Sequence, residues 1–404
     1  MAQGVSAAEG PLAGIRVIDL CHFLAGPYAS VALADLGADV VKVEDPDRPD
    51  EARSIGPHFQ QHQSLYFSSL NWGKRSIALR LAHPDGLPIL KRLIQSADVV
   101  IDNFRPGVMP KLQLDHASLE TLNDRLITCS LTGFGETGPY AKRPGYDYTI
   151  QAISGVMSLT GEPDTPPGKA GISYVDHSSG LAACFAICAA LVERTRTNRG
   201  RHIDLGLFDV QMSMLTYLAS WELNGGHSTG RTSQGSHPSL VPAQTFATQD
   251  GYISVFVGNE SMWNRLVEAI GDQNLADVRF KGNANRVKHR DLLISKLNAH
   301  FSGATSGHWV DLLASHNVSC GRVNEIAAAL EDDQVVARGL IQTVDSPSQD
   351  SFRHLSGPIP TMSTGGLRAA PSLGQDATEL LTELGYSTVQ ITELIKSGAI
   401  VVEK

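Results

Sequence analysis

The chain has 404 residues, of which 42% are hydrophobic and 19% charged, a composition typical of a globular protein large enough for two domains. Its 42 acidic residues exceed its 33 basic ones, and the net charge of −9 argues against a nucleic-acid-binding surface. The five cysteines show no CxxC spacing and there is no HExxH motif, so we predict no metal site and no disulfide framework.

The first residues lack the basic start and apolar run of a signal peptide, and no apolar run reaches the roughly 20 residues of a membrane span. We therefore expect a cytoplasmic protein that binds neither membrane nor nucleic acid.

The first half of the chain alternates short apolar strands with helices. We expect strands at 15–20, 39–44, 76–79, 98–102 and 126–131, a helix that ends at Leu36, and a second helix at 84–96. Near-continuous apolar strands separated by helices predict an α/β fold whose parallel sheet is covered on both faces. Ligands of such a sheet bind at the carboxyl ends of its strands.

A dinucleotide-binding site is the first alternative for this fold, since Glu44 ends the second strand at a suitable distance. The turn after the first strand, 21–27, reads CHFLAGP and lacks the G-x-G-x-x-G glycines that let a pyrophosphate approach the backbone. We therefore expect no NAD or FAD.

The second half changes in texture. A strand at 201–205 precedes a helix that ends at Asn224, and 225–240 is rich in glycine and serine, as in a linker or loop. Strands near 251–257 and helices near 262–270 and 308–315 indicate a small second domain, followed by a strand at 340–344 and helices at 375–384 and 387–396. We expect a large domain over 1–224, a small domain over 225–325, and a tail over 326–404.

The most informative stretch is 171–180, GISYVDHSSG, which places Asp176 before the apolar run 181–192. We expect that run to be a buried helix with Asp176 at its N-cap, where free N–H groups and the helix dipole favour a carboxylate. Two interpretations remain open from the residues alone: a helix cap, and a nucleophile beside an oxyanion hole.

Several motifs in a fixed order are together more specific than any one of them, and they lie at 12–19, 25–27, 36–44, 71–76, 97–107, 132–135, 144–147, around Asp176, at 372–374 and at 384–386. With them the chain resembles the family III coenzyme A transferases, the CaiB/BaiF family, over nearly its whole length. The resemblance implies a Rossmann-like large domain built from both chain ends, a smaller inserted α+β domain, and a homodimer whose two chains interlock.

The resemblance also implies the chemistry. Such enzymes move CoA from an acyl-CoA thioester, their substrate, to a free carboxylic acid, with no permanently bound cofactor. Asp176 is then the nucleophile, which forms an aspartyl anhydride and then an aspartyl-CoA thioester. N–H groups near His177 to Gly180 are expected to stabilise the oxyanions.

Further site residues follow from the resemblance, position by position. CoA is expected to contact the loop after the first strand, the ends of two other strands, and nearby basic groups: His22, Phe23, Leu24, Arg75, Leu79, Asn103, Phe104, Arg105 and Lys111. Gly235 and Ser236 match a glycine loop that closes over the site in relatives, although this loop has fewer glycines here. Some relatives carry a lysine where this chain has Thr132.

Tyr146 bears on the alternatives. Related 2-methylacyl-CoA racemases carry His-Asp where this chain has Tyr146-Asp147, and a phenol, with an ordinary pKa of about 10, is a poor acid/base group at neutral pH. We therefore rank a racemase below a transferase, with a non-catalytic CoA-binding protein as a second alternative. The acids exchanged are not readable from the residues. Small dicarboxylates such as succinate suit the family, and oxalate, carnitine-type and aromatic acids stay open.

Overall fold

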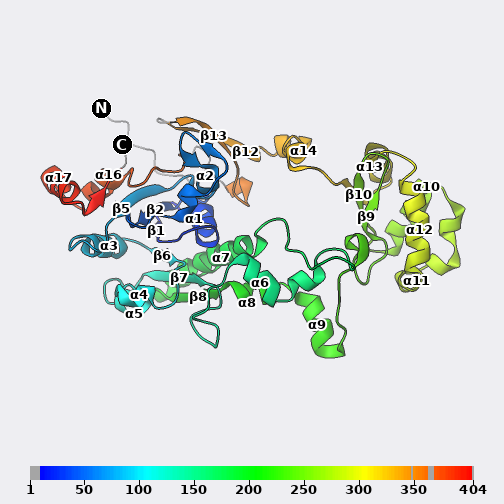
Figure 1. Cartoon of the computed structure of the whole chain (residues 1–404), viewed down its shortest axis with the longest axis horizontal. Coiled ribbons are helices and arrows are strands. Elements are labelled where there is room, and N and C mark those ends of the chain that lie inside the picture. Colours follow the sequence, from blue (N-terminus) through cyan, green and yellow to red (C-terminus); the bar gives the residue numbers. More distant parts are fainter. Residues whose placement is uncertain (1–9, 347–348, 363–367, 403–404) are drawn as a thin grey trace. The chain divides into compact units, whose positions relative to one another are not determined.

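A seven-stranded sheet organises the larger part of the chain (Figure 1). The computed structural model describes residues 10–346, 349–362 and 368–402. The strand order is β14-β5-β2-β1-β6-β7-β8, all parallel except β14, which runs antiparallel to β5. The strands are β1 (Arg16–Asp19), β2 (Asp39–Glu44), β5 (Arg75–Leu79), β6 (Val99–Asp102), β7 (Ile127–Thr132), β8 (His202–Gly206) and β14 (Ile400–Val401).

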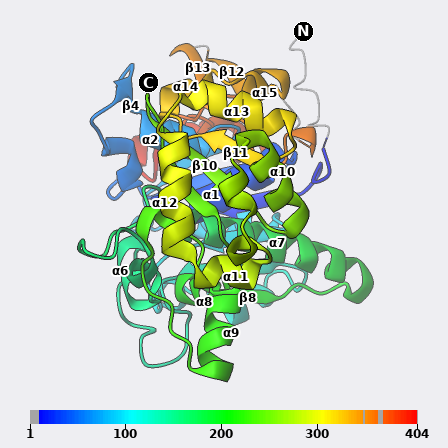
Figure 2. The ribbon, with the colours of Figure 1, turned by 90° about the vertical axis from the view of Figure 1, so that its right-hand side faces the viewer.

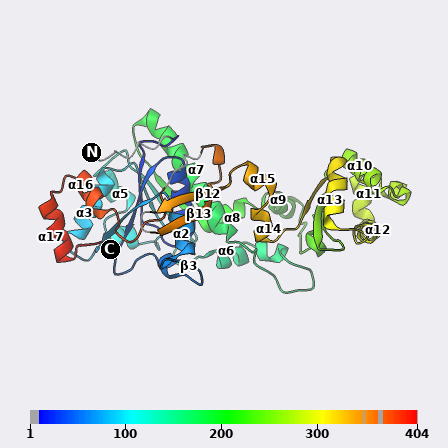
Figure 3. The same cartoon turned by 90° about the horizontal axis from the view of Figure 1, so that it is seen from above.

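Helices cover both faces of this sheet, as the alternating pattern predicts (Figure 3). One apolar core lies under α1 (Ala25–Asp35), α6 (Asp147–Ile153), α7 (Tyr174–Thr197) and α8 (Leu207–Ser213). The other lies under α3 (Gly86–Gln95), α4 (Val108–Lys111), α5 (His116–Glu120), α16 (Ala377–Glu383) and α17 (Thr388–Ser397). The sheet thus forms the middle layer of three.

The chain divides into two compact units. The first contains the sheet and consists of residues up to Ser154, Gly171–Leu215 and Asp333 onward; the second consists of Gly155–Ala170 and Thr216–Asp332. The second unit therefore starts earlier and ends later than the predicted 225–325, and it includes a segment that precedes α7. Because β14 pairs with β5, the end of the chain belongs to the first unit.

The second unit has its own apolar core, built on an antiparallel sheet of order β11-β10-β9 (Figure 2). Its strands are β9 (Ala243–Ala247), β10 (Tyr252–Phe256) and β11 (Ser319–Arg322). Its helices are α9 (Thr216–Gly225), α10 (Glu260–Ile270), α11 (Asn283–Lys288), α12 (Arg290–Phe301), α13 (Ser306–Ser315) and α14 (Ile326–Leu330).

Smaller elements complete the first unit. They are the short helices α2 (Leu65–Asn71) and α15 (Asp333–Ala337), the two-residue strands β3 (Phe59–Gln60) and β4 (Gln63–Ser64), and the hairpin of β12 (Ile341–Ser346) and β13 (Gln349–Leu355).

Helix α7 corrects two expectations. It begins at Tyr174 with Ser173 as its N-cap, so Asp176 lies inside the first turn and not at the N-cap. The apolar run is also not fully buried, since Phe185 is 76% and Val192 63% exposed within this chain. By length and composition α7 is the one described helix that could span a membrane; its other face packs against α1 in the apolar core of the first unit.

Candidate active site

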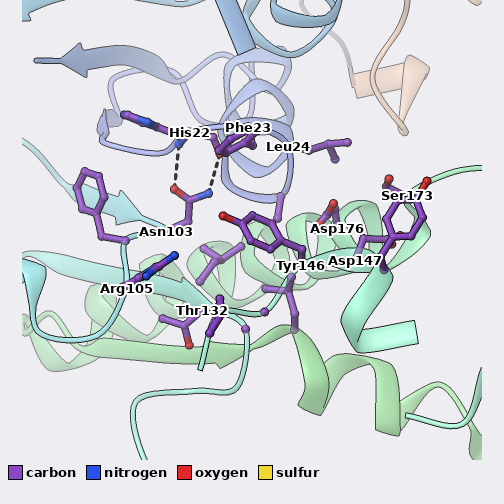
Figure 4. Close-up of a pocket in the computed structure, with 18 of the residues that line it drawn as sticks. His22, Phe23, Leu24, Asn103, Arg105, Thr132, Tyr146, Asp147, Ser173 and Asp176 are labelled. Atoms are coloured by element: carbon purple, nitrogen blue, oxygen red, sulfur yellow. Dashed lines mark hydrogen bonds between the residues drawn. The ribbon is translucent and has the colours of Figure 1, made fainter. Parts of the chain in front are cut away.

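A cavity of about 380 Å³ opens in the first unit where β1, β6 and β7 end (Figure 4). This is the edge of the sheet where a parallel α/β fold places its ligands. Its walls are the loop after β1, the loop after β6, the end of β7, the loop before α6 and the first turn of α7. The polar side chains that line it are those of His22, Tyr66, Asn103, Arg105, Thr132, Arg143, Tyr146, Asp147, Tyr148, Ser173 and Asp176.

Asp176 lies half-buried in this cavity, on the first turn of α7. The start of the helix is fixed by Asp147, whose carboxylate accepts the Val175 N–H at 3.0 Å and the Gln151 side-chain amide at 2.7 Å. Tyr66 lines the same cavity, and burial, followed by the negative charge of Asp176, raises its pKa to about 12. Tyr66 is therefore a neutral phenol at every physiological pH.

The predicted oxyanion donors on α7 are wrong. The His177 N–H already donates to the Ser173 carbonyl at 3.1 Å, and the residues that follow are inside a continuous helix, where each N–H bonds to the carbonyl four positions earlier. Only the first turn of an α-helix has N–H groups without such partners.

A close helix contact brings Asp176 toward the loop after β1. Gly180 packs against α1 so tightly that a Cβ there would lie 2.7 Å from the Ala25 carbonyl oxygen. One turn earlier, the His177 ring meets Tyr28 edge-on, with 4.8 Å between the ring centroids. The first turns of α7 and α1 consequently lie side by side at the cavity.

The loop after β1 carries three of the predicted residues, His22, Phe23 and Leu24, and all three line the cavity. Phe23 adopts a left-handed conformation, with φ +63°, which costs a non-glycine residue about 1–2 kcal/mol. Burial, followed by the charge of Lys42, holds the pKa of His22 below its usual range. Its imidazole is therefore neutral at pH 7, and its ring meets Phe104 edge-on at 5.8 Å.

Asn103, Phe104 and Arg105 follow β6 and also line the cavity, and their contact with CoA stays a prediction. The Asn103 side chain bonds to the backbone of His22, which Figure 4 shows as dashed lines. At the end of β7, the buried Thr132 hydroxyl lacks a hydrogen-bond partner within the described structure. A polar group buried in this way at a cavity is suited to bind a ligand.

Tyr146 lies in the middle of the cavity in Figure 4, is 56% exposed, and meets the Phe23 ring edge-on at 6.3 Å. Its loop approaches the end of β7 closely, since a Cβ on Gly145 would lie 2.5 Å from the Gly133 Cα. Sequence reasoning missed Tyr66 and Arg143, which no recognised motif marked.

Two residues predicted to contact CoA lie elsewhere. Arg75 lies at the amino end of β5, the opposite edge of the sheet, where its guanidinium pairs with Asp39, Glu379 and Glu383. Leu79 is wholly buried beside β14 and leaves no surface for an adenine ring. The motif match located both residues in the sequence. It could not show that carboxylates pair with Arg75 or that the edge strand β14 covers Leu79.

Three further predictions remain predictions. Lys111 ends α4 and is exposed, outside the residues that line the cavity. Gly235 and Ser236 lie in the second unit, where Gly235 and the preceding Gln234 have φ +61° and +57°.

Comparison with known proteins identifies the class. The family model described as CoA-transferase family III matches residues 12–377. A succinate–glutarate CoA-transferase of Agrobacterium fabrum is 38% identical over 93% of this chain and 96% of its own length. A human succinyl-CoA:glutarate CoA-transferase is 34% identical over 96% of this chain and 90% of its own length.

A solved structure supports the same assignment. The crystal structure of a CaiB/BaiF family protein from Brucella suis superposes with a TM-score of 0.81, at 38% identity, over 93% of this chain and 99% of that one. The chain belongs to CoA-transferase family III and is an enzyme. The family expected from the ordered motifs is thereby confirmed.

Proposed function

We propose that this enzyme transfers CoA from an acyl-CoA thioester to a free dicarboxylic acid of four or five carbons, with Asp176 as the nucleophile. The observation that carries the proposal is the position of Asp176, half-buried in a cavity that the loops after β1 and β6 also line. The family match and the succinate and glutarate in the names of two relatives support it.

The reaction proceeds in two matched halves. The Asp176 carboxylate attacks the thioester carbonyl and CoA leaves as thiolate, so that an aspartyl–acyl anhydride forms. The thiolate then attacks the aspartyl carbonyl, which releases the donor acid and leaves an enzyme–CoA thioester. The acceptor carboxylate reverses these steps: it attacks that thioester, and the returning thiolate takes the new acyl group. No proton has to be lost and no oxidant is needed.

The surroundings of Asp176 suit these anionic steps. The neutral Tyr66 phenol lines the same cavity and can donate a hydrogen bond to an anionic group bound there. Arg105 and Arg143 both line the cavity, and neither guanidinium has an ion-pair partner in the described ranges. Two such cations favour substrates that carry more than one negative charge, as a dicarboxylic acid and the CoA phosphates do.

We further propose that two chains form an interlocked homodimer. Along α7, Leu181, Phe185 and Val192 are exposed in the single chain and share one stripe of the helix, at spacings of four and seven residues. Exposed apolar patches of this kind mark protein–protein contacts.

A mass-spectrometric assay in heavy water tests the reaction. The protein is mixed with succinyl-CoA and 2-methylacyl-CoA, each with and without glutarate, succinate and oxalate. We expect a new acyl-CoA to appear only with a matching acid and without deuterium at the α-carbon. Deuterium uptake without a new thioester would instead establish the racemase.

The nucleophile is tested by Asp176→Asn, which keeps the shape of the side chain but removes its charge. We expect transfer to fall by at least about a thousand-fold, while acyl-CoA still binds and no covalent CoA adduct forms on the enzyme. Transfer retained within ten-fold of the unsubstituted enzyme would refute this role, and binding without turnover by either protein would support the non-catalytic alternative.

A further inference from the structure

Side chains bond to the backbone of three consecutive residues in the loop after β1, Cys21, His22 and Phe23. The Cys21 N–H donates to Asp19 at 2.9 Å, and the Cys21 carbonyl accepts from the Lys42 ammonium at 2.7 Å. The Phe23 N–H donates to the Asp50 carboxylate at 3.0 Å. Three separate segments of the first unit therefore hold two residues of one loop.

Asn103 holds the residue between them. Its amide oxygen accepts the His22 N–H at 2.9 Å and its amide nitrogen donates to the His22 carbonyl at 2.7 Å. One side chain thus imitates the pairing of a neighbouring strand, just beyond the point where β1 and β6 end (Figure 4).

An ion pair connects the remaining supports. Lys42 and Asp50 lie 2.8 Å apart and their side chains are wholly buried. Although burial opposes ionisation, the Lys42 charge and hydrogen bond keep the pKa of Asp50 below its usual range. Buried ion pairs contribute little net stability, because desolvation offsets their attraction. Stability alone therefore does not explain this pair, whereas its two bonds to the loop do.

The conformation of the loop needs such support. Phe23 is held in a left-handed conformation that an unsupported non-glycine residue rarely adopts. The loop lines the same cavity as Asp176, and α7 packs against the helix that follows the loop. Its geometry thus affects how any thioester in the cavity meets the nucleophile.

We propose that Asn103 and the Lys42–Asp50 pair are positioning residues, which fix the loop Cys21–Leu24 so that it presents the acyl-CoA thioester to Asp176. The inference rests on the proposed function, since it assumes that an acyl-CoA occupies this cavity. It assigns Asn103 a role through the backbone of His22 in addition to its predicted place beside CoA.

The experiment compares three loop variants of the enzyme with one control variant. Asn103→Ala removes both bonds to His22. The charge-neutral double variant Lys42→Met/Asp50→Asn keeps an acceptor for the Phe23 N–H but removes the donor to Cys21. Asn123→Ala is the matched control, because Asn123 also bonds to backbone groups, of Ala97 and Arg125, away from the loop. The third loop variant, called the combined variant, carries Asn103→Ala together with Lys42→Met/Asp50→Asn.

The measurements are kcat, KM for succinyl-CoA, and the single-turnover rate at which the enzyme–CoA adduct appears when no acceptor is present. We expect kcat and the adduct rate to fall about a hundred-fold in each loop variant, with KM changed less than five-fold, because misplacement by about 1 Å has such an effect. The Asn123→Ala control should keep both rates.

The combined variant separates positioning from direct contact. If both changes act by freeing the same loop, the second change has little further effect once the first has been made. We therefore expect kcat of the combined variant to fall by much less than the product of the two separate fold-losses. Multiplying losses, or a raised KM with unchanged kcat, would overturn the inference. If the unsubstituted enzyme transfers CoA to no acid, the proposed function fails; if it does and Asn103→Ala matches it, the positioning role alone fails.

Discussion

Gly180 sets how closely α7 approaches α1. A Cβ at this position would lie 2.7 Å from the Ala25 carbonyl oxygen and 3.0 Å from the Tyr28 ring. Because a backbone oxygen cannot swing aside, Gly180→Ala must push the two helices apart next to Asp176. We expect about 1–3 kcal/mol of lost stability and at least a ten-fold lower kcat, measured by thermal unfolding and steady-state transfer.

Gly307→Ala is the control for this prediction. Gly307 lies in the first turn of α13, where an added Cβ meets no atom within 4 Å. Alanine in a helix is favoured over glycine by roughly 0.5–1 kcal/mol, so this variant should unfold at an equal or higher temperature. An equal effect of both substitutions would contradict the packing argument.

Asp102 gives the protein a specific pH dependence. Burial raises its pKa to about 6, against the hydrogen bonds from the Ser130 hydroxyl and the Phe104 N–H. In the unfolded chain its pKa is about 3.9. Between pH 4 and 6 the unfolded chain therefore loses a proton that the native protein keeps, and native stability falls as pH rises through this window. Above pH 6 the loss stays constant, on the order of 2–3 kcal/mol.

Asp102→Asn tests that sign. The variant should be more stable than the unsubstituted protein at pH 7.5, and this advantage should shrink toward pH 4. Urea unfolding of both proteins at pH 4, 5.5 and 7.5 measures it. An advantage that does not depend on pH would show that the pKa of Asp102 is the same in the native and unfolded states.

At the scale of elements, the five strands predicted in the first half are present within one or two residues of their predicted bounds. Buried parallel strands are read well from sequence because their apolar runs are local. β14 was missed since two residues carry no period, and its place is set by pairing with β5. The helix expected to end at Asn224 breaks near Thr216, whose φ is +37°, and becomes α8 and α9.

The supports of the site were less predictable than its motifs. Lys42 in the strand DVVKVE was a readable signal, since a lysine within a buried strand requires a buried partner. Nothing local identified Asp50 as that partner, or showed that Asn103 reaches His22 across 81 residues of sequence. Such contacts follow from how the strands are ordered in the sheet. The motifs therefore marked the proposed nucleophile, and the order of the strands supplied the side chains that hold the loop beside it.

At the scale of the whole molecule, the single chain leaves apolar surface that a second copy would cover. Phe185 is 76% and Val192 63% exposed on a helix whose other face lies in the core. Covering two such side chains contributes roughly 1.5–3 kcal/mol each. This exposed surface supports the proposed homodimer, in which a second copy would cover this face of α7.

An interlocked dimer differs from an ordinary one in how it exchanges subunits. Linked chains separate only when one of them opens, so exchange requires unfolding and is limited by its rate. We mix tagged and untagged dimers at micromolar concentration and follow mixed dimers by native mass spectrometry. We expect none after a day in buffer, and a statistical mixture after joint unfolding and refolding in urea. Mixed dimers within minutes would show an ordinary interface, whose subunits dissociate and reassociate by mass action. A monomeric mass at this concentration would refute the dimer.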